Sequence, residues 1–241
     1  MKMQRILTYI TSILTVLLMT FSAGAQNDSI ANDSIRYVQK YGLRLGGDIS
    51  KLVRSFIDDD YTGFEINGDY RLSKNLYIAG ELGTEEKTTN SDYLNSTAQG
   101  SYFKGGIDYN LYQNWFGMEN MIYSGFRAGF GTFNQTINSY TIYDTNGQPW
   151  GPQTTVTDGS KQSGLTAIWG ELILGIKAET FNNLYMGFNV QLKGRITETE
   201  PSNFENLYIP GFGRTYDSGS FSVSFGYNVS YLIPLFKKDK E

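Results

Sequence analysis

The 241-residue chain contains no cysteine and no histidine, which excludes disulfides, thiol or imidazole catalysis and histidine-bound metals. Its formal net charge of −4 argues against a dedicated nucleic-acid surface. Aromatic residues make up 15% of the chain and glycines number 27, a composition that favours β-strands joined by tight turns.

The N-terminus carries the three parts of an export signal. Lys2 and Arg5 precede an apolar run, Ile6–Phe21, and small residues lead to Ala25. We expect a signal peptide over residues 1–25, cleaved after Ala25. The alternative is an N-terminal membrane anchor, which a run this short disfavours.

The mature chain has no second apolar run long enough for a spanning helix, so a membrane location would require a closed barrel. Residues 26–40 are polar and are expected to form a periplasmic linker. Within them, Asp28–Ile30 and Asp33–Ile35 repeat an Asp-Ser-Ile triplet. The triplets are similar to O-glycosylation acceptors of Bacteroidota; the alternative is an unmodified linker.

Beyond the linker, apolar and polar residues alternate with the period of two that is typical of strands with unlike faces. The pattern predicts an all-β, eight-stranded antiparallel up-and-down transmembrane β-barrel over residues 41–236, followed by a periplasmic tail, 237–241. The expected strands are 41–50, 62–72, 76–83, 101–111, 121–133, 165–179, 184–196 and 219–236.

Within each expected strand, one face carries the large apolar residues and the other carries all the charges. A charge-free face is what lipid requires, because a Lys or Arg facing the midplane costs about 2–4 kcal/mol. We therefore expect a charge network in the lumen. Its members are Arg44, Asp48, Glu65, Asp69, Arg71, Glu81, Lys104, Asp108, Arg127, Glu171, Lys177, Lys193 and Arg195, with Glu179 on the same face.

The connections between the expected strands alternate in length. Those at 73–75, 112–120 and 180–183 are short, as periplasmic turns are, and the extracellular ones are long. The long ones are 51–61, 84–100, 134–164 and 197–218.

Aromatic residues near the strand ends are expected to form two interfacial girdles. The alternative is the ordinary aromatic core of a soluble barrel. The expected girdle residues are Tyr41, Tyr70, Tyr109, Tyr112, Trp115, Phe116, Phe181, Tyr185 and Tyr231 on the turn side, and Phe64, Phe130, Phe133 and Phe221 on the loop side.

The final strand resembles the assembly signal of outer-membrane proteins, through Ser224, Gly226, Val229 and Tyr231. The resemblance implies recognition by the barrel-assembly machinery, although the strand continues beyond Tyr231. The whole mature chain resembles small barrels of the OmpX, OmpW and OmpA-barrel kind. Ala25-Gln26 and the Tyr/Asn/Gly-rich composition are similar to Bacteroidota proteins.

Four loop features invite a functional interpretation. Asp58–Asp60 fits either a cation site or a solvated loop tip, and Asp144–Gly147 fits a hairpin turn better than a calcium loop. Pro149–Pro152 places Trp150 near the tip of a projecting hairpin, where it meets a partner or packs locally. Tyr208–Gly213 is expected to fold over the barrel mouth.

Balanced charges in a narrow lumen predict a paired polar plug and not a water-filled pore. We expect no enzyme activity, catalytic residue, cofactor or metal. The favoured function is an outer-membrane scaffold, in contact with lipid, that presents extracellular loops or joins a larger outer-membrane complex. One alternative is a narrow transporter for small or apolar molecules; another is a periplasmic lipid-binding barrel of the lipocalin type.

Overall fold

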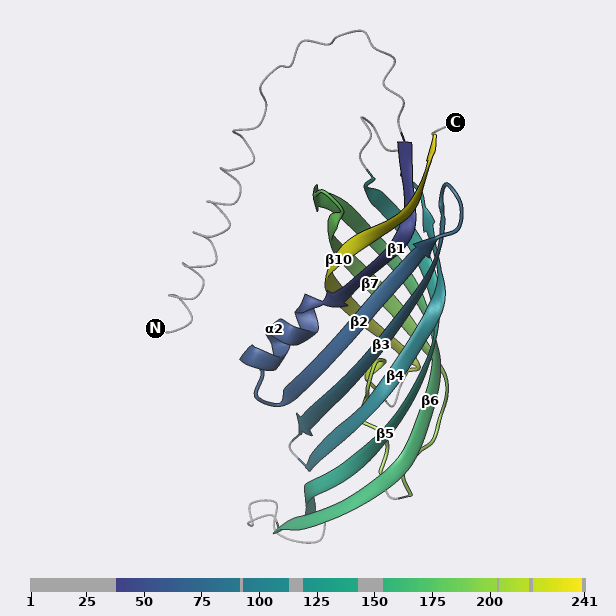
Figure 1. The fold of residues 1–241 in the computed structure, drawn as a ribbon. Helices are drawn as coiled ribbons and strands as arrows, with labels where there is room; N and C mark the ends of the chain where they lie inside the picture. The colour runs from purple at the N-terminus through teal and green to yellow at the C-terminus, as the bar shows by residue number, and fades with distance from the viewer. Residues whose placement is uncertain are drawn as a thin grey trace. The chain divides into compact units, whose positions relative to one another are not determined.

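The computed structural model describes residues 38–91, 93–112, 119–142, 154–202, 204–216 and 219–239. Eight antiparallel strands close into a barrel in the order β1-β10-β7-β6-β5-β4-β3-β2 (Figure 1). They are β1 (Val38–Asp48), β2 (Tyr61–Arg71), β3 (Leu76–Asn90), β4 (Leu94–Asn110), β5 (Met121–Ile142), β6 (Thr154–Phe181), β7 (Leu184–Glu198) and β10 (Phe221–Asp239). The predicted eight-stranded up-and-down barrel is confirmed.

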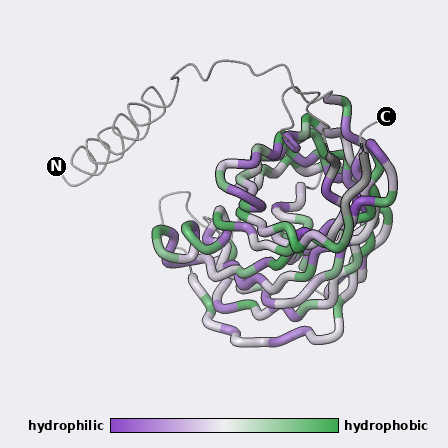
Figure 2. The backbone as a smooth tube through the Cα atoms, turned by 45° about the horizontal axis from the view of Figure 1, so that its top comes forward, coloured by the Kyte–Doolittle hydropathy of each residue, from purple (hydrophilic) through white to green (hydrophobic). Residues whose placement is uncertain are grey.

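The barrel wall separates its side chains strictly by position. Along β5, Met121, Tyr123 and Arg127 are buried in the lumen, whereas Ile122 and Phe126 point outward. Figure 2 shows hydrophobic and hydrophilic positions following one another along the strands. This arrangement follows from the strand geometry, which sends successive side chains to opposite faces of the sheet.

Large apolar side chains surround the barrel, and we call this surface the apolar belt. A patch of this extent does not remain exposed to water on a monomeric protein, and it is the surface that lipid requires. The barrel is therefore of the membrane-spanning, outer-membrane kind. The belt includes Leu45, Phe64, Ile66, Ile78, Leu82, Phe103, Ile107, Phe126, Phe130, Ile168, Leu172, Leu174, Ile176, Met186, Val190, Leu192, Phe225 and Ile233.

Pairing between β1 and β10 closes the barrel, from Val38↔Asp239 to Asp48↔Asn228. Gly42 and Gly46 allow this close approach, because a Cβ at Gly42 would lie 2.1 Å from a β10 carbonyl oxygen and one at Gly46 2.3 Å from another.

Several expected strand limits and connections were wrong. β1 begins three residues before Tyr41, and β10 reaches Asp239 instead of Phe236. Most of 84–100 and 134–164 is strand, because β3 to β6 continue past the ends of β2 and β7. We call these extensions, at 88–90, 94–97, 134–142 and 154–164, the blade. Both faces of the blade are largely polar, so the apolar alternation that indicates a strand is absent.

The expected loop 51–61 contains a helix, α2 (Ile49–Ile57), which also corrects the placement of Ile49 in the first strand. Asp48 caps the helix by accepting a hydrogen bond from the Ser50 amide at 2.7 Å. Ile49, Leu52, Val53, Phe56 and Ile57 repeat at helical spacing, which is the signal that identifies such a helix. Among the described residues, no helix is long and apolar enough to cross a membrane.

Three expected girdle residues face the interior. Tyr41 is buried because a bulge at Tyr41/Gly42 changes its side of the strand. Tyr185 and Phe133 are buried because each stands an even number of residues away from the inward-facing side chains of its strand. Trp115 and Phe116 lie outside the described residues.

Other expectations also fall outside the described residues: the signal peptide, the linker up to residue 37, both Asp-Ser-Ile triplets, and the hairpin tip with Asp144–Gly147 and Pro149–Pro152. The strands on either side of that tip do pair, Ile142 with Thr154, so the predicted projecting hairpin is confirmed up to this point.

The apolar belt predicts how an outward charge affects stability. Phe126 lies in the middle of the belt segment of β5, with half of its surface exposed (50%). We expect Phe126→Arg to reduce the free energy of unfolding in lipid vesicles by about 2–4 kcal/mol, measured by urea titration. Thr154→Arg, at an exposed position of the blade, is the control and should change it little. Equal stability of the two variants would show that Phe126 does not face lipid.

Candidate functional site

Ion pairs run through the lumen as one connected series, which begins near the end of the barrel that holds the β2–β3 turn. Arg44 Nε donates to Asp69 Oδ1 at 2.7 Å, and Lys177 Nζ donates to Asp69 Oδ2 at 2.7 Å. Lys177 also lies 3.8 Å from Asp108, which pairs with Arg127 at 2.8 Å. Each carboxylate in this half therefore lies between two cations.

Lys104 is the centre of the other half. Its ammonium group pairs with Glu81, lies 3.2 Å from Glu65 and 3.9 Å from Glu171. Glu81 also receives Arg127 at 3.3 Å, which joins the two halves. Because Lys104 comes from β4 and its three carboxylates from β2, β3 and β6, this one cation connects opposite parts of the wall.

The series ends in two branches near the opposite mouth of the barrel, beside α2. One passes from Glu171 to Lys193 at 3.7 Å. The other passes from Glu65 to Lys51 of α2 at 3.7 Å, and Lys51 pairs with Glu85. Cations and anions occur in equal numbers, as burial in a medium of low dielectric constant demands. We call this set the ion-pair chain: Arg44, Lys51, Lys104, Arg127, Lys177 and Lys193 with Glu65, Asp69, Glu81, Glu85, Asp108 and Glu171.

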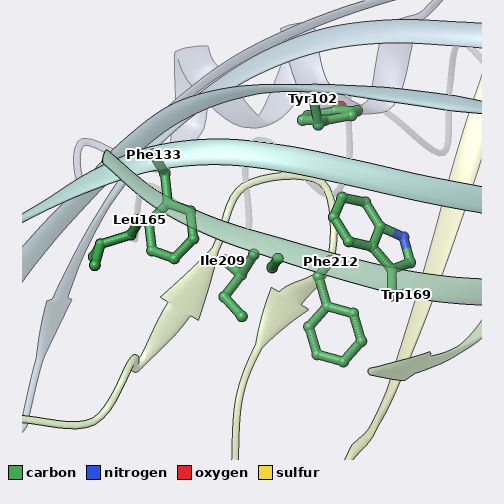
Figure 3. Close-up of a cluster of buried hydrophobic side chains, with 7 residues drawn as sticks. Tyr102, Phe133, Leu165, Trp169, Ile209 and Phe212 are labelled. Carbon is green, nitrogen blue, oxygen red and sulfur yellow. The ribbon is translucent and has the colours of Figure 1, made fainter. Parts of the chain in front are cut away.

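Above the ion-pair chain, the β7–β10 connection folds into the mouth of the barrel as a small hairpin, β8 (Tyr208–Ile209) and β9 (Gly213–Arg214). Ile209 and Phe212 pack against Tyr102, Trp169 and other wall residues, as Figure 3 shows. This confirms the prediction that Tyr208–Gly213 folds over the mouth.

Polar contacts join this hairpin to the ion-pair chain. Lys193 Nζ donates to the Gly211 carbonyl oxygen at 2.6 Å. Glu85 accepts from the Gly211 amide at 3.0 Å and from the Tyr208 hydroxyl at 2.7 Å. The seal at the mouth and the charges below it are therefore one structure.

Little free space remains inside the described barrel. A cavity of about 20 Å³, lined in part by Asp69, Glu81, Tyr123 and Arg127, has room for about one water molecule.

The family follows from comparison of the whole chain. Residues 6–238 match the model of a family described as "Domain of unknown function (DUF6048)". The chain belongs to the DUF6048 family. No curated protein matches it. Among solved structures, it is similar to the crystal structure of Ail, the attachment invasion locus protein of Yersinia pestis, at 7% identity and a TM-score of 0.38, over 80% of this chain and 97% of Ail.

Most of the lumen residues named from the sequence lie in the ion-pair chain of this DUF6048 barrel, but three do not. Asp48 caps α2, and Arg195 pairs with Glu198 at 2.5 Å. Arg71 lies at the β2–β3 turn, where it donates to the Lys74 carbonyl at 2.7 Å and faces Glu119 at 3.4 Å. Glu179, named beside the network, pairs there with Lys40 at 3.1 Å.

Sequence reasoning missed two members of the ion-pair chain, Lys51 and Glu85. Glu85 stands four residues after Glu81 on β3 and therefore faces the same, inward side. It would have been found if the third strand had been extended past residue 83. Lys51 was missed because α2 was not predicted; its helical position turns it inward, away from the apolar residues around it.

Asp58, the first carboxylate of the Asp58–Asp60 run in this DUF6048 protein, is bound by protein cations. Asp58 accepts from Lys87 at 3.1 Å and from Arg54 at 3.1 Å. Partial burial raises the pKa of Asp58, but the hydrogen bonds from Lys87 and Arg54 outweigh it and hold the pKa below its usual value. Among the described residues, no group of three or more carboxylates is arranged to hold a metal ion.

The assembly-signal residues Ser224, Gly226, Val229 and Tyr231 lie on β10, between β1 and β7. Tyr231 points outward. Recognition of this strand by the assembly machinery stays a prediction.

The centre of the ion-pair chain can be tested by removing one charge. Lys104→Met leaves three carboxylates without their shared cation, and we expect a loss of about 3–5 kcal/mol in the free energy of unfolding. Lys87→Met breaks only a more exposed pair with Asp58, and should cost about 1 kcal/mol or less. Adding Glu81→Gln to Lys104→Met should restore part of the loss. Similar losses for the two single variants would contradict a connected chain.

The hairpin in the mouth depends on a glycine. Gly211 has φ +82°, and a Cβ there would lie 2.5 Å from the Tyr102 ring. We expect Gly211→Ala to displace the hairpin and to expose residues 204–216 to limited proteolysis. Gly159→Ala shares the positive φ, +75°, but meets no atom within 4 Å, so it serves as the control for backbone strain. Equal protection of the hairpin in both variants would contradict this packing.

Proposed function

We propose that this DUF6048 barrel is a non-enzymatic outer-membrane scaffold whose blade presents a contact surface outside the cell. The sealed lumen is the observation that carries the proposal. An ion-pair chain fills the barrel, and a hairpin covers its extracellular mouth. A barrel closed in this way acts through its surface.

The blade supplies that surface. The pairing of β3 with β2 ends at Lys87, and the pairing of β6 with β7 ends at Ala167. Past these points, the described parts of β3, β4, β5 and β6 pair only with one another. Among the described residues, the β6 edge, 154–164, has no strand partner on its outer side. Exposed strand edges accept further strands, and loops or hairpins held by a rigid frame commonly carry binding. The blade therefore fits either an extracellular partner or another subunit of a larger outer-membrane complex.

A narrow transporter for small or apolar molecules is the second candidate. It is favoured by α2, which stands in the wall where β1 has ended and therefore interrupts the continuous sheet. Such a protein would move its substrate sideways through the wall, because the lumen itself is filled.

Planar-bilayer recordings separate the two candidates. The scaffold should show no discrete conductance steps and no uptake of small apolar dyes into vesicles. Dye uptake or regular steps by the wild-type protein would favour the transporter.

A blade truncation tests the scaffold directly. Residues 136–161 are replaced by an Asn-Gly turn that closes on the Gln135↔Gln162 pair. We expect normal folding, because the barrel pairings below remain. In the full-length protein, a photoreactive residue at Thr157 should crosslink to neighbouring proteins in intact outer membranes, and co-purification of those proteins should be lost in the truncated variant. A probe at Leu72, on the opposite rim, is the control and should be unaffected. An absence of crosslinks at Thr157 in the full-length protein would count against the scaffold.

A further inference from the structure

Helix α2 occupies the place in the barrel wall where β1 would otherwise continue toward the mouth. β1 pairs with β2 only as far as Gly47↔Ile66, and with β10 only as far as Asp48↔Asn228. β2 and β10 nevertheless continue toward the mouth, β2 to Tyr61 and β10 to Phe221. α2 contacts both strands there and projects beside β2 in Figure 1.

The polar side of α2 is bound to the barrel. Ser55 Oγ accepts from the Gly63 amide at 2.8 Å and donates to the Lys51 carbonyl at 2.9 Å, so this side chain satisfies a β2 backbone donor that β1 no longer reaches. Lys51 enters the ion-pair chain, and the Arg54 guanidinium lies 4.0 Å from the centre of the Tyr61 ring. These contacts fix which side of the helix faces outward.

The outward side of α2 is apolar. Leu52, Val53, Phe56 and Ile57 lie on it, and Phe56 exposes 86% of its surface. The apolar belt lies on both flanks, through Phe64 on β2 and Phe225 on β10. A helix with basic residues on one side and Phe, Leu and Ile on the other is typical of segments that lie at a lipid interface.

A groove separates α2 from the outer surface of β2, β3 and β4. Leu52 and Phe56 of α2 and Phe64 of β2 give it an apolar floor, and its volume is about 370 Å³. The polar end of the groove is formed by Thr62, Thr84, Glu86 and Gln99.

The groove lies at the outer border of the belt. Phe64 is paired with Thr84, the position at which the outward residues of β3 change from Leu82 to polar ones. One end of the groove therefore opens onto hydrocarbon, and the other reaches the depth of polar headgroups.

We propose that this groove is a binding site for one acyl chain of an outer-leaflet membrane lipid. The proposal rests on the membrane placement that the proposed function also requires. The apolar floor continues directly into the lipid-facing belt, so a chain from the surrounding leaflet enters without leaving hydrocarbon. The polar end accepts hydrogen-bond donors of a headgroup through Glu86 and the hydroxyls of Thr62 and Thr84. The helix supplies a second wall, so a lipid here has more apolar contact than a lipid on the bare barrel.

The test uses the full-length mature protein in phosphatidylcholine nanodiscs that contain a phosphatidylethanolamine, whose headgroup carries N–H donors, with a diazirine in its acyl tail. Photolysis followed by peptide mass spectrometry should give more adducts on α2 and residues 61–66 than on the belt around Phe126. Thr62→Trp should fill the groove and reduce those adducts severalfold. Thr132→Trp, at an outward position of β5, is the matched control and should leave them unchanged.

Three outcomes would overturn the inference. Uniform labelling around the belt would show ordinary annular lipid, and unchanged labelling in Thr62→Trp would place the lipid elsewhere. Crosslinks between α2 of two copies, with the groove unlabelled, would assign this surface to a dimer. An absence of labelling over the whole belt would instead contradict the membrane placement, so failure of the proposed function is distinguishable from failure of the groove alone.

Discussion

The structure depends on the pairing of charges inside a barrel that is too narrow to hydrate them. Eight strands leave an interior that side chains fill, and an isolated charge there is strongly unfavourable. The ion-pair chain meets this requirement by placing each charge next to opposite ones, from Arg44 to Lys193. The apolar belt on the outside and the sealed lumen on the inside are two results of the same alternation of side chains.

The sequence predicted the barrel well, because lipid imposes one rule on every strand. Charges cannot face outward, so the parity of residues such as Asp69, Lys104 and Glu171 is enough to assign the two faces of each strand. That rule does not apply to strands outside the membrane. In the blade both faces meet water, so the extension of β3 to Asn90 was expected to be a loop, and the extension of β5 to Ile142 was predicted only as part of a projecting hairpin.

The site was harder to predict than the fold. Parity indicates that a side chain faces the lumen, but not which partner it meets, since partners come from strands far apart in the sequence. Lys104 and Glu171 are such a case. The hairpin contacts of Gly211 depend on the path of a whole connection. Helix α2 was missed because most of its residues were assigned to a loop and their helical spacing was not used. The connection that carries α2 is also where the wall departs from a plain sheet.

The central position of Lys104 has a consequence for how the barrel forms. Its carboxylate partners belong to β2, β3 and β6, so a sheet that contains only some of these strands carries charges without counterparts. The unpaired charges therefore raise the free energy of a partly assembled sheet in lipid until the last of these strands joins. Insertion and closure should accordingly be a cooperative, all-or-none event, in which half-built intermediates are too unstable to accumulate.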